Sequence, residues 1–346
     1  MSRNILLKNW SQMPKIILIT VLLFLSGLSV AEAETVSDEN TAAIKLSEQL
    51  NENLTESPLN LKVRKLTMQG SQVSSEFADN LLRLISHELK SNTDDFHSVG
   101  ELSRGITSRG LEVLPNEDED PKAQDAFLEG TYKTVAKQVV VQLSLVGGDG
   151  KSISRAEISL PVSGVKHELQ PPNFLLAQKT EKVAAQNEAQ QPKDFSVELG
   201  LNKADGATFR EGEKLKIFFR SAEDCYLLLF YQDVMGNRYI LYPDTEQQRK
   251  TKLLANQGFD VTKELKLEIS CNPACGAEMI LAFASENPAK IPGAKEDLNG
   301  SDLRGYPASF SLTKIIGQQR GIKRSEKKAE ARVYLTTVKK IVAENL

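Results

Sequence analysis

The sequence has 346 residues, with 43 Lys and Arg against 46 Asp and Glu, and a formal net charge of -3 at pH 7. Proteins that bind nucleic acid normally carry a strong basic excess, so we do not expect DNA or RNA as a partner. The length leaves room for two domains, each able to bury a hydrophobic core of its own.

Residues 1–33 have the layout of a secretory signal. Three basic residues precede an uncharged apolar run at 16–30, and small residues, Ala31 and Ala33, follow it at the two positions that a signal peptidase reads. The sequence therefore predicts cleavage between Ala33 and Glu34. We expect the mature chain in the periplasm of a bacterial cell envelope.

The apolar run is shorter than the roughly 20 residues that span a bilayer. An uncleaved signal, which would make the protein a membrane-tethered regulator, is the alternative interpretation. No later segment has the length and apolarity of a membrane span, so we expect no direct span in the mature chain. Cleavage changes the 43 basic and 46 acidic residues to 40 and 45, which leaves a mature net charge near -5.

The first predicted domain, 60–165, follows a polar leader at 34–59 that we expect to be ordered at best in part. Alternating residues predict a strand at 61–68. Ser74 and Ser75 then offer a cap for a helix whose apolar residues recur at intervals of three and four. The apolar residues of this helix are Phe77, Leu81, Leu84, Ile85 and Leu89.

Further short strands complete this domain. A second strand is expected at 95–99, and an acidic run at 117–120 predicts a solvated loop. Three alternating runs follow at 126–132, 139–145 and 153–160, and turn residues rich in glycine separate the last two, which is a hairpin signal. We therefore expect an α+β domain in which a helix packs on a small, mainly antiparallel sheet.

A linker rich in Gln, Pro and Ala is predicted at 166–194. The remainder, 195–346, consists of short apolar runs separated by turn residues, which is typical of an all-β, sandwich-like domain. Its clearest hairpin tip is 233–237. The strands begin at Phe195 and continue at 215–219, 226–231, 239–242, 265–269, 279–283 and 333–337.

The cysteines are few and lie in the second predicted domain. In an oxidising compartment Cys271 and Cys275 are positioned to form a disulfide, with Cys225 left over or exchanging with one of them. All three histidines lie in the first domain or the linker, and a four-ligand zinc site needs more Cys or His than this. We expect no metal site and no cofactor.

No complete catalytic motif is present. The nucleophile pattern Gly-x-Ser-x-Gly is absent, and the second domain has no histidine to activate a cysteine. Carboxylates remain an alternative, because Asp224, Asp233 and Asp244 flank one hairpin and Glu278 is near in sequence. They would give an enzyme acting on envelope glycan or peptide, but we predict no catalytic residue.

The second predicted domain contains a series of short motifs. They are Thr208-Phe209-Arg210-Glu211-Gly212-Glu213-Lys214-Leu215, Asp224-Cys225-Tyr226-Leu227, Tyr231-Gln232-Asp233, Gly236, Leu241-Tyr242-Pro243-Asp244 and Cys275-Gly276-Ala277-Glu278. Through these motifs residues 195–340 resemble the bacterial domain-of-unknown-function family 4384. The resemblance implies an accessory or binding role, and that family has no catalytic residue set to carry over.

The segment Phe127-Leu128-Glu129-Gly130-Thr131-Tyr132, with the two strands after it, is similar to a small α+β domain of secreted envelope-assembly proteins. These include the flagellar outer-membrane protein O and curli-secretion accessory groups. Together the observations predict a non-enzymatic extracytoplasmic accessory protein that acts through protein–protein contacts in an envelope or secretion assembly. We expect an envelope protein as its partner, with peptidoglycan or glycan as a further contact.

Overall fold

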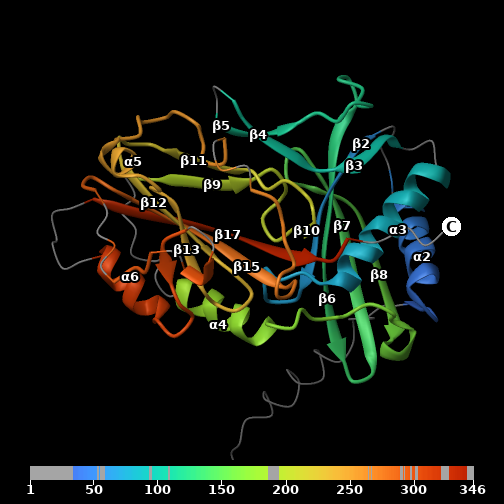
Figure 1. The fold of residues 1–346 in the computed structure, drawn as a ribbon. Helices are drawn as coiled ribbons and strands as arrows, with labels where there is room; N and C mark the ends of the chain where they lie inside the picture. The colour runs from blue at the N-terminus through green and yellow to red at the C-terminus, as the bar shows by residue number, and fades with distance from the viewer. Residues whose placement is uncertain are drawn as a thin grey trace, which may run out of the picture. The chain divides into compact units, whose positions relative to one another are not determined.

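The computed structural model describes residues 34–52, 54, 59–92, 96–107, 110–185, 195–263, 265, 267–288, 291, 293–296, 298–300, 303–320 and 327–340. The chain divides between Glu34 and Thr35, and the fold lies in Thr35–Leu346. The predicted signal, including Ala33, lies outside the described residues. Glu34, the expected first mature residue, begins strand β1 (Glu34–Thr35). The fold is a mixed α/β arrangement with many strands and few helices (Figure 1).

The first sheet is mixed, not mainly antiparallel. Strand β2 runs parallel to both β3 and β6, whereas β6, β7 and β8 form antiparallel hairpins. The order within Thr35–Leu346 is β8, β7, β6, β2, β3. Its strands are β2 (Leu59–Met68), β3 (Phe96–Glu101), β6 (Gln124–Val135), β7 (Gln138–Gly147) and β8 (Ser152–Pro161).

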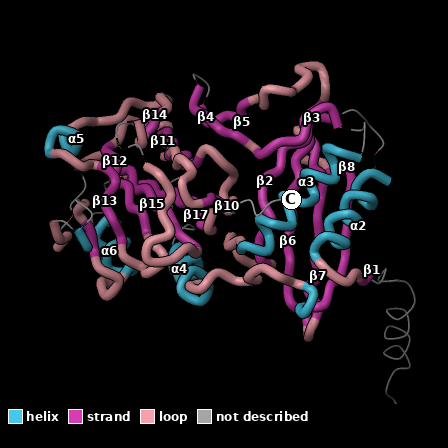
Figure 2. Tube along the Cα trace, turned by 45° about the vertical axis from the view of Figure 1, so that its right-hand side comes forward, coloured by secondary structure: helices cyan, strands magenta, loops and turns pink. Residues whose placement is uncertain are grey.

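Two helices, α2 (Glu39–Glu52) and α3 (Glu76–Asn92), pack on this sheet (Figure 2). The predicted cap of α3 is present, because the Ser75 hydroxyl accepts a hydrogen bond from the Ala78 backbone at 3.2 Å. Helix α2 corrects the expected leader at 34–59. Its buried residues recur on one face and join the first hydrophobic core, so this segment is part of the domain. They are Ala42, Ala43, Leu46 and Leu50.

The expected linker at 166–194 is folded as far as Ala185. It contains helix α4 (Phe174–Ala185), and the Asn173 side chain in front of that helix donates to the carbonyls of Val234 and Ala277 at 3.1 and 2.7 Å. The buried side chains of α4 are small, so the segment has the composition of a linker although it packs as a helix. They are Ala177, Thr180 and Ala184. Residues 186–194 lie outside the described part of the chain.

The C-terminal half is mostly β. Its larger sheet has the order β10, β17, β15, β12, β13, β16, and a smaller one has the order β14, β11, β9. The strands are β9 (Val197–Leu201), β10 (Thr208–Arg210), β11 (Ile217–Ser221), β12 (Tyr226–Gln232), β13 (Arg238–Tyr242), β14 (Phe259–Asp260), β15 (Ala277–Ser285), β16 (Gly305–Tyr306) and β17 (Lys328–Val338).

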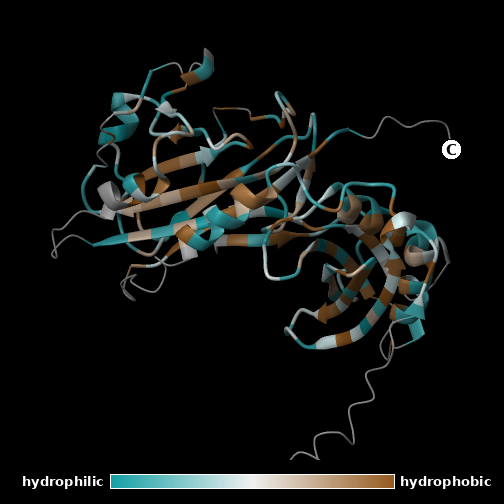
Figure 3. Ribbon diagram, turned by 90° about the horizontal axis from the view of Figure 1, so that it is seen from below, coloured by the Kyte–Doolittle hydropathy of each residue, from teal (hydrophilic) through white to brown (hydrophobic). Residues whose placement is uncertain are grey.

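Because successive side chains of these strands point to opposite faces of the sheet, the C-terminal half has two hydrophobic cores. Leu229 and Ile280 of the larger sheet share a core with Phe219 of the smaller sheet. Their chain neighbours point to the opposite face, where Phe230 and Leu281 pack with Ile315 of helix α6 (Leu312–Arg320). Hydrophobic residues follow these strands in Figure 3.

Several short elements complete the fold. In the described part of the expected strand at 265–269, Glu268 forms an isolated bridge with Lys214. Of the described helices, none is long and apolar enough to cross a membrane. The remaining elements are β4 (Ser103–Thr107), β5 (Gly110–Leu114), η1 (Val162–Gly164), α5 (Glu246–Lys250) and η3 (Leu298–Gly300).

Candidate functional site

Two of the four candidate carboxylates belong to one polar network. Glu278 of β15 accepts hydrogen bonds from the Tyr231 hydroxyl at 2.6 Å and the Thr337 hydroxyl at 3.1 Å. The Tyr231 ring stacks on Tyr239 with centroids 6.1 Å apart, and the Tyr239 hydroxyl donates to Asp233 at 3.2 Å. The two tyrosines therefore connect Glu278 to the hairpin tip.

Glu278 is only 4% exposed, and this burial raises the pKa of its carboxyl to about 7, against the lowering effect of the hydrogen bonds from Tyr231 and Thr337. Burial, and then the charge of Glu278, also raises the pKa of Tyr231 well above its ordinary value. This pair can hold a proton near neutral pH. Because it is enclosed by protein, a dissolved substrate does not reach it in this conformation.

The other carboxylates stabilise turns. Asp224 accepts from the Ala255 backbone at 2.8 Å. Asp233 also accepts from the backbones of Met235 and Asn237 at 2.9 and 2.8 Å, which closes its own hairpin. Asp244 is exposed just before α5. Backbone hydrogen bonds of the kind made by Asp224 and Asp233 are typical of acidic residues in turns.

The expected disulfide between Cys271 and Cys275 is confirmed. Cys225 is buried and free, and burial raises the pKa of its thiol, which keeps it protonated and unreactive. Within the described parts of the chain, no three His, Cys, Asp or Glu residues gather where they could hold a metal ion.

A histidine–carboxylate pair lies outside these predictions. His167 Nδ1 is 2.7 Å from the buried Glu39 carboxylate, which also accepts from the Asn80 side chain at 2.6 Å and the Lys166 backbone at 2.6 Å. A cavity of about 210 Å³ borders the pair. The His167 backbone also donates to Glu39, at 3.2 Å. Glu39 thus connects the segment after β8 to α2 and α3, and these hydrogen bonds explain its burial.

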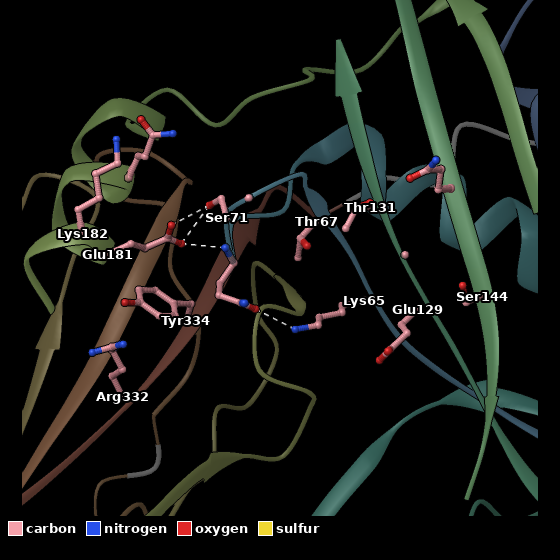
Figure 4. Close-up of a pocket in the computed structure, with 15 residues that line it drawn as sticks. Lys65, Thr67, Ser71, Glu129, Thr131, Ser144, Glu181, Lys182, Arg332 and Tyr334 are labelled. Atoms are coloured by element: carbon pink, nitrogen blue, oxygen red, sulfur yellow. Dashed lines mark hydrogen bonds between the residues drawn. The ribbon is translucent and has the colours of Figure 1, made fainter. Parts of the chain in front are cut away.

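The candidate site is a larger polar cleft of about 680 Å³ (Figure 4). One wall is the outer face of the first sheet, and the other is formed by α4 and β17. Hydroxyl, amide and charged groups predominate in it, with Tyr334 as its aromatic ring. The lining residues are Lys65, Thr67, Gly70, Ser71, Gln72, Glu129, Gly130, Thr131, Gln142, Ser144, Gln178, Glu181, Lys182, Arg332 and Tyr334.

Strand alternation makes the sheet wall polar. In β7 the buried residues Val141, Leu143 and Leu145 face the first core, so Gln142 and Ser144 point to the cleft. The same period of two operates in β2 and β6. These polar positions were visible in the predicted strands, but nothing in the sequence indicated that a second wall would stand opposite them.

The opposite wall is attached by Glu181 of α4. Its carboxylate accepts from the Ser71 hydroxyl at 3.0 Å and the Gln72 backbone at 2.9 Å. The Gln72 side chain in turn accepts from Lys65 at 2.8 Å. Figure 4 shows these bonds running from Glu181 on the helix side to Lys65 on the sheet side. They hold the turn after β2 against a helix that lies far along the chain.

An ion-pair network also joins the two halves. Arg210 of β10 binds Asp79 of α3 at 2.9 Å, and Lys203 binds Glu101 at 2.9 Å. Thr208 donates to Asp79 at 2.7 Å. The two walls of the cleft are therefore connected by buried and half-buried polar contacts.

The residues that line the cleft include no histidine or cysteine, and the Ser71 hydroxyl among them donates to the Glu181 carboxylate. The cleft offers paired donors and acceptors, three cations and two carboxylates. A polar ligand with both charged and hydroxyl groups matches this lining.

Residues 208–288 match the family described as "Domain of unknown function (DUF4384)". That segment contributes Arg210 to the ion-pair network and Glu278 to the tyrosine network, whereas every lining residue of the cleft lies outside it. No curated protein matches the chain. The expected likeness of the N-terminal region to envelope-assembly accessory domains therefore has no support among the matches. What the comparisons assign is a family resemblance for part of the C-terminal half.

Proposed function

We propose that this chain is a non-enzymatic accessory protein of the bacterial cell envelope that works by binding another envelope component in the cleft. The signal-like segment 1–33 supports the location. The observation that carries the proposal is the cleft itself, most of whose lining residues have hydroxyl, amide or charged side chains. In the C-terminal half, two sheets that share one core support a sandwich-like fold.

Crosslinking in intact cells followed by purification of the chain tests this proposal. A specific envelope component should co-purify with the wild-type chain and be reduced when Gln178 and Thr131, which line the cleft, are both replaced by Trp. The matched control is Lys122→Trp, an exposed position outside the cleft. Recovery of no specific component, or equal recovery with both variants, contradicts the proposal.

A carboxylate enzyme is the second candidate, favoured by the pKa of about 7 at Glu278. Such an enzyme would hydrolyse envelope glycan or peptide. Its test is turnover of purified envelope fragments by the wild-type chain and by Glu278→Gln and Asp233→Asn. Turnover that both substitutions abolish would establish the enzyme and overturn the binding proposal.

A third arrangement keeps the signal uncut and tethers the protein to the membrane. N-terminal sequencing of the protein from cells distinguishes the two, because cleavage after Ala33 leaves Glu34 as the first residue. We propose the cleaved, periplasmic form. A first residue within 1–15 contradicts it.

A further inference from the structure

The carboxylates of the cleft are already engaged by the chain itself. Glu181 accepts from the Ser71 hydroxyl and the Gln72 backbone. Glu129 accepts from Arg64 at 3.2 Å. The charge of Glu129 is therefore offset by Arg64, whereas the donors to Glu181 are neutral, so the cleft lining holds three cations against one carboxylate without a cationic partner among the described residues.

Two lysines of the cleft are engaged differently. Lys65 donates to the neutral side chain of Gln72, and Lys182 of α4 is exposed, with no ion pair or hydrogen bond to any described residue. Figure 4 places them on opposite sides of the cleft, one from the sheet and one from the helix. Ammonium groups in such positions are available to a ligand's carboxylates.

The surroundings of Lys65 add to the excess of positive charge. The positive charges of Lys65, Arg104 and Arg332 all interact electrostatically with one carboxyl group, that of Asp205. Burial raises the pKa of Asp205, and these three cations oppose that rise. Burial, together with the charge of Arg64, lowers the pKa of Arg104. A half-buried region with more cations than carboxylates attracts an anion.

The rest of the lining favours a sugar–peptide ligand over a simple anion. Thr131, Ser144, Gln142 and Gln178 present hydroxyl and amide groups that match sugar hydroxyls, acetamido groups and peptide bonds. A phosphate-rich polymer would place dense negative charge against Glu181 and its neighbours. A glycopeptide has widely spaced carboxylates and a free amine, so it would bring less negative charge near Glu181.

We infer that the cleft binds the glycopeptide of the bacterial cell wall, and that Lys65 and Lys182 hold its peptide carboxylates. This inference rests on the proposed binding function and names its ligand. No covalent step is involved. The glycan would lie along the hydroxyl and amide groups of the sheet wall, with its peptide reaching across toward α4.

Titration calorimetry with the purified full chain tests the inference. The probes are soluble disaccharide-peptides from cell-wall digests, the same fragments with their carboxylates converted to amides, and a phosphate-bearing envelope glycan. Lys65→Gln and Lys182→Gln should each weaken binding of the unmodified fragment roughly tenfold, because each removes one charge-assisted hydrogen bond. Neither should change binding of the amidated fragment. Binding of the unmodified fragment should also weaken as salt is added.

The matched control is Lys151→Gln, an exposed lysine on the β7–β8 turn outside the cleft, which should leave the affinity unchanged. Thermal unfolding of each variant verifies that it is folded. Equal binding of amidated and unmodified fragments, or binding of the phosphate glycan alone, overturns the inference. If the fragments fail to bind while crosslinked capture still depends on the cleft, the inference is wrong and the proposed function stands. If both fail, both are wrong.

Discussion

The Arg210 guanidinium donates from Nη2 to both carboxylate oxygens of Asp79, at 2.9 and 3.0 Å. Arg210 belongs to β10 of the C-terminal half and Asp79 to α3 of the N-terminal half. Asp79 is 7% exposed, so the carboxylate depends on these donors. This contact, which belongs to the segment matched to the family of unknown function, joins that segment to the α/β half.

Replacing Arg210 with Ala should lower the free energy of unfolding by about 1–3 kcal/mol, because it leaves the buried carboxylate of Asp79 without its main donor. Urea unfolding measures the change. The exposed pair of Arg249 with Glu246 is the control, and Arg249→Ala should change stability by no more than about 0.5 kcal/mol. Equal changes in the free energy of unfolding at both positions would mean that the contact between the halves contributes no more to stability than an exposed ion pair does.

Glu278 should make stability fall as pH rises. Its folded pKa of about 7 lies above the ordinary value of 4.5, so between these values the folded state binds a proton that the unfolded state has released. The stabilisation is fully present below pH 4.5 and is lost by about pH 7. Its size is about 3 kcal/mol.

Urea unfolding of the wild type and Glu278→Gln across that pH window checks this prediction. The stability of the wild type relative to the variant should decrease from pH 4.5 to about 7 and then level off. Glutamine keeps an acceptor for Tyr231 and does not titrate, so the comparison isolates the contribution of the Glu278 proton to stability. A difference that is constant with pH would show that folding does not raise the pKa of Glu278.

The cysteines should react in a fixed order. Without reductant the folded chain should take up no alkylating reagent, since Cys271 and Cys275 are paired and Cys225 is buried. Mild reduction should make Cys271 and Cys275 reactive, and denaturation should then make all three cysteines reactive. Mass spectrometry measures the number of labels at each step. Replacing the pair with Ser should cost about 2 kcal/mol, the value for so short a loop. Labelling of Cys225 in the folded chain would contradict its burial.

Glu181 should control the attachment of α4 to the first sheet. Glu181→Ala removes the acceptor for Ser71 and Gln72, and we expect faster hydrogen exchange in α4 and in the turn that it holds. Glu157→Ala, at a sheet position outside the cleft lining, is the control and should leave α4 unchanged. Unchanged exchange in Glu181→Ala would mean that the other contacts of α4, such as those of Asn173 in front of it, are enough to hold it.

The elements that the sequence predicted well are those with strong local periodicity. The apolar stripe of α3 and the alternation of β6, β7 and β8 are each readable within one segment. The segments of helices α2 and α4 were expected to be a partly ordered leader and a linker, because their composition is largely polar and several of their buried positions hold small residues, such as Ala43 and Ala177. The parallel pairing of β2 with β6 was missed because no local signal specifies a partner so distant in the chain.

The candidate site was harder to predict than the fold. Lys65 and Tyr334 lie near opposite ends of the described chain, and only tertiary packing brings them to one cleft. Sequence reasoning instead selected the carboxylates around the 233–237 hairpin, whose side chains mostly serve turns and a buried network. The Cys271–Cys275 disulfide was predictable because its partners are close in sequence, although the sequence left Cys225 open as an exchange partner.

Site-specific photocrosslinking in living cells tests the central claim most directly. A photoreactive phenylalanine derivative replaces Gln178, which lines the cleft, or Lys151, which does not. The account predicts an adduct with one envelope component from position 178 and none from position 151. No adduct from position 178, or the same adducts from both positions, would contradict a binding function located in the cleft.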